Sequence, residues 1–195
     1  MQVQELAPGL WRWTAPHPGW EAGAAPGSPA DWPREVGCVY YEASDAVVLI
    51  DPLVPPERES FLEALDRDVE RLGRPVAIVL TVTWHERSAA ELGARYGAGR
   101  DTPAAVVALR VEGAEETLYW LPEHGTLVAG DVLIGDGAGG LRICPDSWLP
   151  EETEPDALRA ELRRLLELPV ERVLVSHWEP VLAGGHAALA AALEA

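Results

Sequence analysis

Hydrophobic residues recur along the chain with two spacings, one typical of helices and one typical of strands. Leu62, Leu65 and Val69 follow the helical spacing, which predicts an amphipathic helix over residues 57–72. The uninterrupted apolar run at 76–80 is instead typical of a buried strand. The same patterns predict further strands at 3–6, 10–14, 36–41, 46–50, 104–110, 117–121, 126–129 and 172–175, and further helices at 88–96, from 153 onwards and at 187–193.

The order of these elements predicts a mixed α/β fold. Groups of two or three strands alternate with single helices, an order that is neither a strict βαβ repeat nor all-β. Two packed sheets with helices outside accommodate it, so we expect a four-layer αββα sandwich with residues 1–195 as a single domain. Segment 15–33, rich in Pro, Gly and Ala, is predicted to be a long loop that carries His17, Trp20 and Trp32.

The charge balance argues against several classes of partner. The chain has 32 acidic and 15 basic residues, a formal net charge of −17. Nucleic acids and anionic membranes bind to positively charged surfaces, and this chain has too few basic residues to form one readily. All the basic residues are arginine, and the absence of lysine excludes Schiff-base chemistry and a P-loop lysine.

Cysteine usage and the chain's start indicate a cytoplasmic protein. Cys38 and Cys144 are the two cysteines, and we expect both to be reduced and unpaired. Residues 1–6 have no basic stretch followed by an apolar one, so no secretory signal is expected. No apolar run approaches the roughly 20 residues that a membrane span needs. Eight tryptophans are compatible with a groove or with a homo-oligomer interface.

Four segments together resemble the metallo-β-lactamase fold superfamily. Within that superfamily they are most similar to the glyoxalase II-like hydrolases. The segments are 47–52 (VVLIDP), 79–81 with the loop and helix that follow, 127–133 (LVAGDVL) and 173–181 (VLVSHWEPV). The resemblance covers nearly the whole chain and implies the αββα fold. It also implies an active-site cleft in which a histidine- and aspartate-rich motif holds two metal ions.

The metal-binding motif itself is degenerate. Aligned on Thr81, its four ligand positions fall on Val82, Trp84, Glu86 and Arg87. The stretch at 110–120, where the family carries a further histidine, contains glutamates instead. The dinuclear site is therefore predicted to be lost, and no metal is expected.

Asp131 and His177 remain at positions that resemble family metal ligands. Because an arginine cannot ligate a metal, we expect Arg87 to replace it and to form an ion pair with Asp131. His85 is either an exposed loop residue or a general base that faces the cleft.

Three functions stay open at this stage. The first is a metal-independent protein that binds a small molecule or a protein partner through the old cleft. The second is a hydrolase of thioesters or other esters, with one zinc, iron or manganese ion held by Asp131, His177, Glu86 and, in one version, His85. The third is a structural or oligomerisation module. The candidate cleft residues are Trp84, His85, Glu86, Arg87, Asp131, His177, Trp20 and Trp32.

Overall fold

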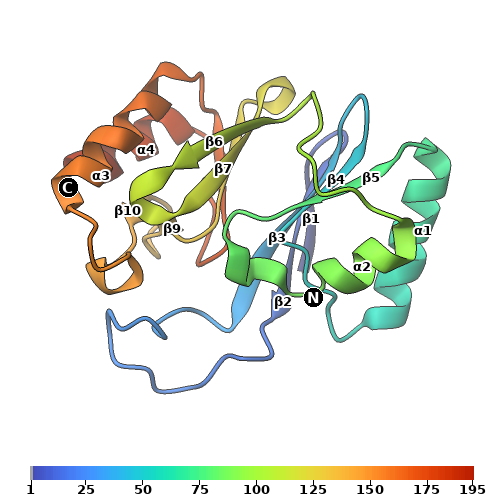
Figure 1. The fold of residues 1–195 in the computed structure, drawn as a ribbon, viewed down its shortest axis with the longest axis horizontal. Coiled ribbons are helices and arrows are strands. Elements are labelled where there is room, and N and C mark those ends of the chain that lie inside the picture. The colour runs from blue at the N-terminus through green and yellow to red at the C-terminus, as the bar shows by residue number, and fades with distance from the viewer. Residues whose placement is uncertain (1) are drawn as a thin grey trace.

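The structure, a computed structural model, describes residues 2–195 and contains two β-sheets that pack against each other (Figure 1). The strands are β1 (Gln2–Ala7), β2 (Leu10–Pro16), β3 (Glu35–Glu42), β4 (Val47–Ile50), β5 (Val76–Val79), β6 (Val107–Val111), β7 (Glu116–Leu121), β8 (Thr126–Ala129), β9 (Leu133–Gly135), β10 (Leu141–Ile143) and β11 (Arg172–Val175). The first sheet has the order β1-β2-β3-β4-β5 and the second the order β11-β8-β7-β6, while β9 and β10 form a hairpin. Strands β4 and β5 run parallel, as do β8 and β11, and the other neighbours run antiparallel.

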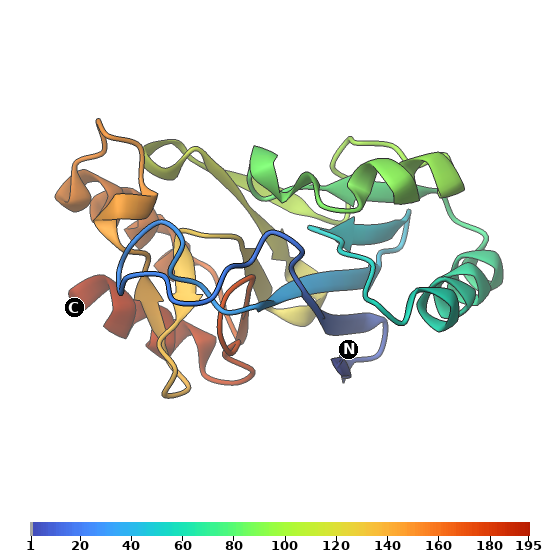
Figure 2. The ribbon, with the colours of Figure 1, turned by 90° about the horizontal axis from the view of Figure 1, so that it is seen from below.

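Helices cover the outer faces of both sheets. They are α1 (Arg58–Leu72), α2 (Ala89–Tyr96), α3 (Pro155–Leu162) and α4 (Gly185–Glu194). Figure 2 shows α1 and α2 at one end of the molecule, α3 and α4 at the other, and the sheets between them. Short 3₁₀ turns connect the elements, among them η1 (Thr83–Glu86) and η4 (Asp146–Trp148).

Three apolar clusters fill the spaces between the layers. Successive side chains of a strand point to opposite faces, so Leu49 of β4 packs with Leu62 of α1 while the next residue, Ile50, packs with Val128 of β8. A third cluster joins the second sheet to α3 and α4. The predicted αββα sandwich is confirmed.

Segment 17–34 between β2 and β3 has no regular structure and is tied to η4. The indole N–H of Trp148 donates to the carbonyl oxygen of Ser28 at 2.8 Å, and the hydroxyl of Ser147 donates to the carbonyl oxygen of Gly27. Figure 1 shows this segment running from the end of β2 toward the β9–β10 hairpin. The loop therefore bridges the first sheet and the far side of the molecule.

Cys38 and Cys144 are both free and buried, which confirms the prediction that they are unpaired. No helix within residues 2–195 is long and apolar enough to cross a membrane.

Candidate functional site

The polar residues of the candidate site follow the carboxyl ends of the two parallel strand pairs. Asp51 comes directly after β4 and His85 lies in η1 after β5, while Asp131 and His177 follow β8 and β11. Parallel neighbours end at the same edge of a sheet, and ligand sites of α/β proteins form at such edges. Each sheet therefore delivers two of these side chains to one place.

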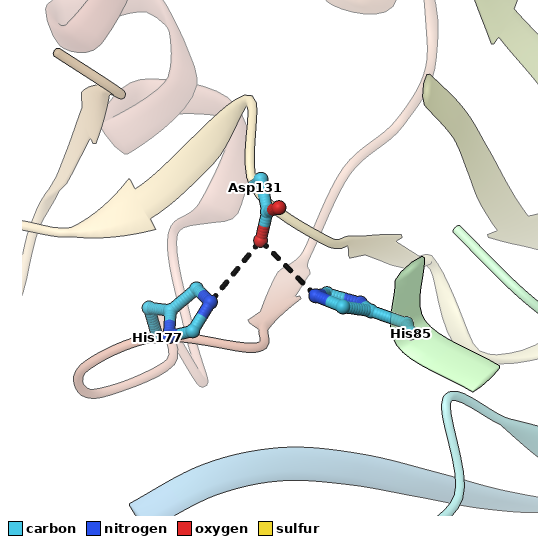
Figure 3. Close-up of side chains that lie close together, drawn as sticks. All are labelled: His85, Asp131 and His177. Atoms are coloured by element: carbon cyan, nitrogen blue, oxygen red, sulfur yellow. Dashed lines mark hydrogen bonds and ion pairs between the residues drawn. The ribbon is translucent and has the colours of Figure 1, made fainter. Parts of the chain in front are cut away.

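Three of these side chains form a compact cluster (Figure 3). The Nε2 atoms of His177 and His85 lie 3.1 Å and 3.3 Å from the same carboxylate oxygen, Oδ1 of Asp131. One ligand atom from each residue lies within 4.8 Å of the other two. The exposed-loop alternative for His85 is wrong, because its side chain is only 6% exposed.

Asp51 holds His85 from behind. Its carboxylate lies 2.9 Å from Nδ1 of His85 and accepts hydrogen bonds from the backbone N–H and the hydroxyl of Thr81, at 2.8 Å and 2.5 Å. The proton on Nδ1 therefore faces Asp51, and Nε2 is the ring nitrogen that faces Asp131.

Burial and charge set the protonation of the cluster. Burial favours the neutral acid at Asp131, yet hydrogen bonds from His177 and His85 hold its pKa well below the usual range. Burial also acts against a charged His85, but the nearby Asp51 carboxylate raises the pKa of that imidazole to about 9. At His177 burial prevails and lowers the pKa. In the metal-free protein at neutral pH, His85 is therefore cationic and His177 is neutral.

Glu116 fixes the turn that carries Asp131. This fully buried carboxylate accepts hydrogen bonds from the backbone N–H groups of Gly130, Asp131 and Val132, at 2.7, 2.8 and 2.8 Å. A side chain at Gly130 would collide with Thr81, since its Cβ would lie 2.2 Å from the threonine hydroxyl. The sequence pointed to a glutamate in this region but gave no signal of this role.

Arg87 does not pair with Asp131, so that prediction is wrong. Its guanidinium donates to the carbonyl oxygens of Gly37 and Asp51, at 3.1 Å and 3.0 Å, and more weakly to the hydroxyl of Ser176 at 3.4 Å. These contacts connect Arg87 to β3, which contains Gly37, and to Asp51, the residue that follows β4. His85 takes the position beside Asp131 that Arg87 was expected to occupy.

Backbone strain concentrates around the cluster. Asp51, Arg87 and Trp178 have φ angles of +49°, +38° and +61°, which non-glycine residues rarely adopt. Each lies within the site or directly beside one of its residues. Strain of this kind persists where the surrounding structure requires it, and it gathers at functional sites.

A cavity of about 390 Å³ opens above the cluster. Trp32 and Trp148 line it, with ring centres 5.6 Å and 5.4 Å from that of His177. Trp84 lines it as well, and its indole N–H donates to Oδ2 of Asp131 at 2.8 Å. His17, which the sequence placed in the loop without assigning it a role, is also a lining residue.

Two candidate residues lie outside this cavity. Glu86 is exposed and pairs with Arg100 at 2.8 Å, away from Asp131 and His177. Trp20 does not line the cavity but supports it, because its indole N–H donates to the carbonyl oxygen of Trp32 at 2.8 Å. Of the eight candidates, the structure brings Trp84, His85, Arg87, Asp131, His177 and Trp32 together.

The donor set of the cluster fits one metal ion. Two imidazoles and a carboxylate are a common ligand set for iron and zinc, and His85 has a carboxylate behind its other ring nitrogen as metal-bound histidines usually do. Ligand atoms about 2.0–2.2 Å from one ion lie roughly 2.8–3.6 Å apart at usual coordination angles. The two separations from Asp131 to the imidazoles, 3.1 Å and 3.3 Å, fall in that range, and the ligand nitrogens of the two imidazoles lie within 4.8 Å of each other.

No protein-family model and no curated protein matches the chain. Solved structures match it over nearly its whole length. A metallo-β-lactamase from Erythrobacter litoralis has a TM-score of 0.66 and 18% identity, covering 98% of this chain and 94% of that one. A DIM-1 metallo-β-lactamase has a TM-score of 0.66 and 11% identity, covering 99% and 94%. The similarity to the glyoxalase II-like branch stays a prediction, because sequence identities this low identify the fold alone. This chain has the metallo-β-lactamase fold that its four sequence segments predicted.

Proposed function

We propose that the protein is a hydrolase of thioesters or other esters that uses a single metal ion held by His85, Asp131 and His177. The observation that carries the proposal is the convergence of two imidazoles and a carboxylate at the floor of a cavity. His85 replaces Glu86 in the ligand set considered from the sequence, because Glu86 faces Arg100 instead.

The residues around the cluster have supporting roles in this proposal. Asp51 orients His85, Glu116 holds the turn of Asp131, and Trp84 fixes the second oxygen of Asp131. A bound zinc, iron or manganese ion supplies Lewis acidity toward a carbonyl and an activated water at neutral pH. Trp32, Trp84 and Trp148 provide aromatic walls beside the place where the substrate would bind.

A second candidate is the metal-independent small-molecule binder. It is favoured by the charge balance of the cluster, since His85 carries a positive charge at neutral pH when no metal is bound. Two carboxylates, Asp51 and Asp131, then face two cations, His85 and Arg87. In this version the cluster is a rigid floor for a binding cleft and has no catalytic part.

Metal analysis of protein purified without chelator separates the two candidates. We expect about one equivalent of zinc, iron or manganese, and ester hydrolysis that a chelator abolishes and the metal restores. His177→Ala and His85→Ala should both lose the metal, while Glu86→Ala, a carboxylate of the same turn, should keep it. If no metal is bound and none of the three ions restores hydrolysis, the hydrolase proposal fails and the metal-independent binder remains.

A further inference from the structure

The side chain of Trp84 is exposed to the cleft and yet fixed in position. It is 57% exposed, one of the few large apolar side chains of residues 2–195 with such exposure. Its indole N–H is bound to Asp131, so the ring cannot turn away freely. A large apolar ring held open to solvent by a residue of the site is typical of a surface that a ligand covers.

Two further indoles, those of Trp148 and Trp32, line the same cavity. Trp148 is held by its bond to Ser28, and Trp32 is part of the loop that Trp20 braces. Their rings flank His177, and Trp84 approaches Asp131. The walls of the cavity are therefore flat and aromatic directly beside the cluster.

The net charge of the chain disfavours a ligand that carries several negative charges. Arg87, the arginine that lines the cavity, uses one terminal nitrogen, Nη1, to donate to the carbonyl oxygens of Gly37 and Asp51. The whole chain carries a formal net charge of −17. A field of this sign repels multiply charged anions such as nucleotides.

We infer that Trp84 is the binding platform for an uncharged, planar aromatic group of the ligand. Stacking on this indole places a carbonyl attached to the aromatic group next to His85, Asp131 and His177. The substrate class that follows is an uncharged aromatic ester or thioester. The ester part rests on the proposed function, whereas the aromatic preference concerns binding alone.

Binding can be measured without turnover. Chelator-treated protein is titrated with two uncharged, non-hydrolysed probes, N-benzylacetamide and N-(cyclohexylmethyl)acetamide, and Kd is obtained by ligand-observed NMR. We expect the benzyl probe to bind about three- to tenfold more tightly, the range expected for a stacked aromatic pair. Trp84→Leu should abolish this preference, and Trp84→Phe should retain most of it, because phenylalanine keeps the flat face but has no N–H. Trp11→Leu is the matched control, since Trp11 lines a different cavity and should leave the preference unchanged.

Every outcome of this titration bears on the inference. Equal affinity of the two probes, no binding of either, or an aromatic preference that survives Trp84→Leu overturns it. Melting temperatures of the variants establish that each is folded before its Kd is interpreted. If the preference is present but no metal restores hydrolysis of benzyl esters, the inference holds and the hydrolase proposal fails. If benzyl and cyclohexylmethyl esters are hydrolysed equally well and bind equally, the hydrolase holds and the inference fails.

Discussion

Two buried carboxylates, Asp51 and Glu116, shape the candidate site although neither belongs to the cluster itself. Asp51 is 2% exposed and Glu116 is fully buried, and each carboxylate is satisfied by donors from the protein. Buried charges are retained only where hydrogen bonds replace the lost water. At the residue scale, the site depends on how these two acids hold His85 and Asp131.

Glu116→Gln should destabilise the fold by roughly 1–3 kcal/mol, because an amide NH₂ would then face a backbone N–H donor in the buried turn. The effect is measured as the free energy of unfolding in urea. Glu115→Gln is the control, since that neighbouring side chain is exposed and its substitution should change the stability by less than about 0.5 kcal/mol. Equal stabilities of the two variants would contradict the role assigned to Glu116.

Both thiols should resist alkylation in the folded protein. Burial raises the pKa of Cys38 from 9.0 to about 11 and that of Cys144 to about 12. At pH 8 the folded thiolate fraction of Cys38 is then about a hundredfold lower than the unfolded one, and burial slows the reaction further. The folded state binds these protons more tightly, so the associated stability is present below pH 9.0 and is lost as the pH rises through about 11.

Mass spectrometry after iodoacetamide treatment, with and without urea, measures this protection. Rapid labelling of Cys38 without urea would show that the first sheet opens locally.

At the element scale, the sequence was informative wherever hydrophobic spacing was regular. The helix predicted at 57–72 is α1 (Arg58–Leu72), and the strand predicted at 172–175 is β11. The β9–β10 hairpin was missed because each of its strands has only three residues. Patterns of alternation need about four residues before they are distinguishable from a loop.

The site residues that were predictable are those that closely follow a strand recognised in the sequence. Asp131 and His177 follow strands that the sequence identified, so their positions could be inferred from the resemblance. For His85 the sequence left two alternatives open, because the alignment of the motif does not determine where the η1 turn directs each side chain. That turn is kinked at His85 (φ −80°, ψ 25°), which directs His85 into the cleft and leaves Glu86 on the surface.

The loop at 17–34 provides a prediction at this scale. Trp148→Phe removes the N–H that binds the carbonyl oxygen of Ser28 but keeps an aromatic ring in place. We expect faster amide hydrogen exchange over residues 25–31, which the tether holds, and unchanged exchange in β2 and β3. Unchanged exchange in the loop would show that the tether to η4 does not order it.

At the scale of the whole molecule, the two sheets are arranged so that their parallel strand pairs face the same cleft. Strands β4 and β5 bring Asp51 and His85 from one sheet, and β8 and β11 bring Asp131 and His177 from the other. The contact between His85 and Asp131 therefore joins the two halves, while the bond between His85 and Asp51 lies within the first half. Anything that strengthens or removes this junction should change the stability of the entire fold.

Metal binding provides the corresponding prediction. An ion that binds only the folded state stabilises it by about 2.7 kcal/mol when its free concentration is 100 times Kd. For a domain of this size, that corresponds to a rise in Tm of roughly 5–11 °C. Zinc or manganese added to chelator-treated protein should produce such a rise in the wild type and in Glu86→Ala, but not in His177→Ala.

The metal-free alternative predicts a different pattern in the same melting experiment. No ion should then change Tm. His85→Ala should instead lower the stability by roughly 3–5 kcal/mol, because Asp51 and Asp131 lose the cation between them. If the protein binds a metal ion, His85→Ala removes one of its ligands and should lose the metal-induced rise in Tm. If it binds none, His85→Ala should lower Tm by the same amount with and without added metal.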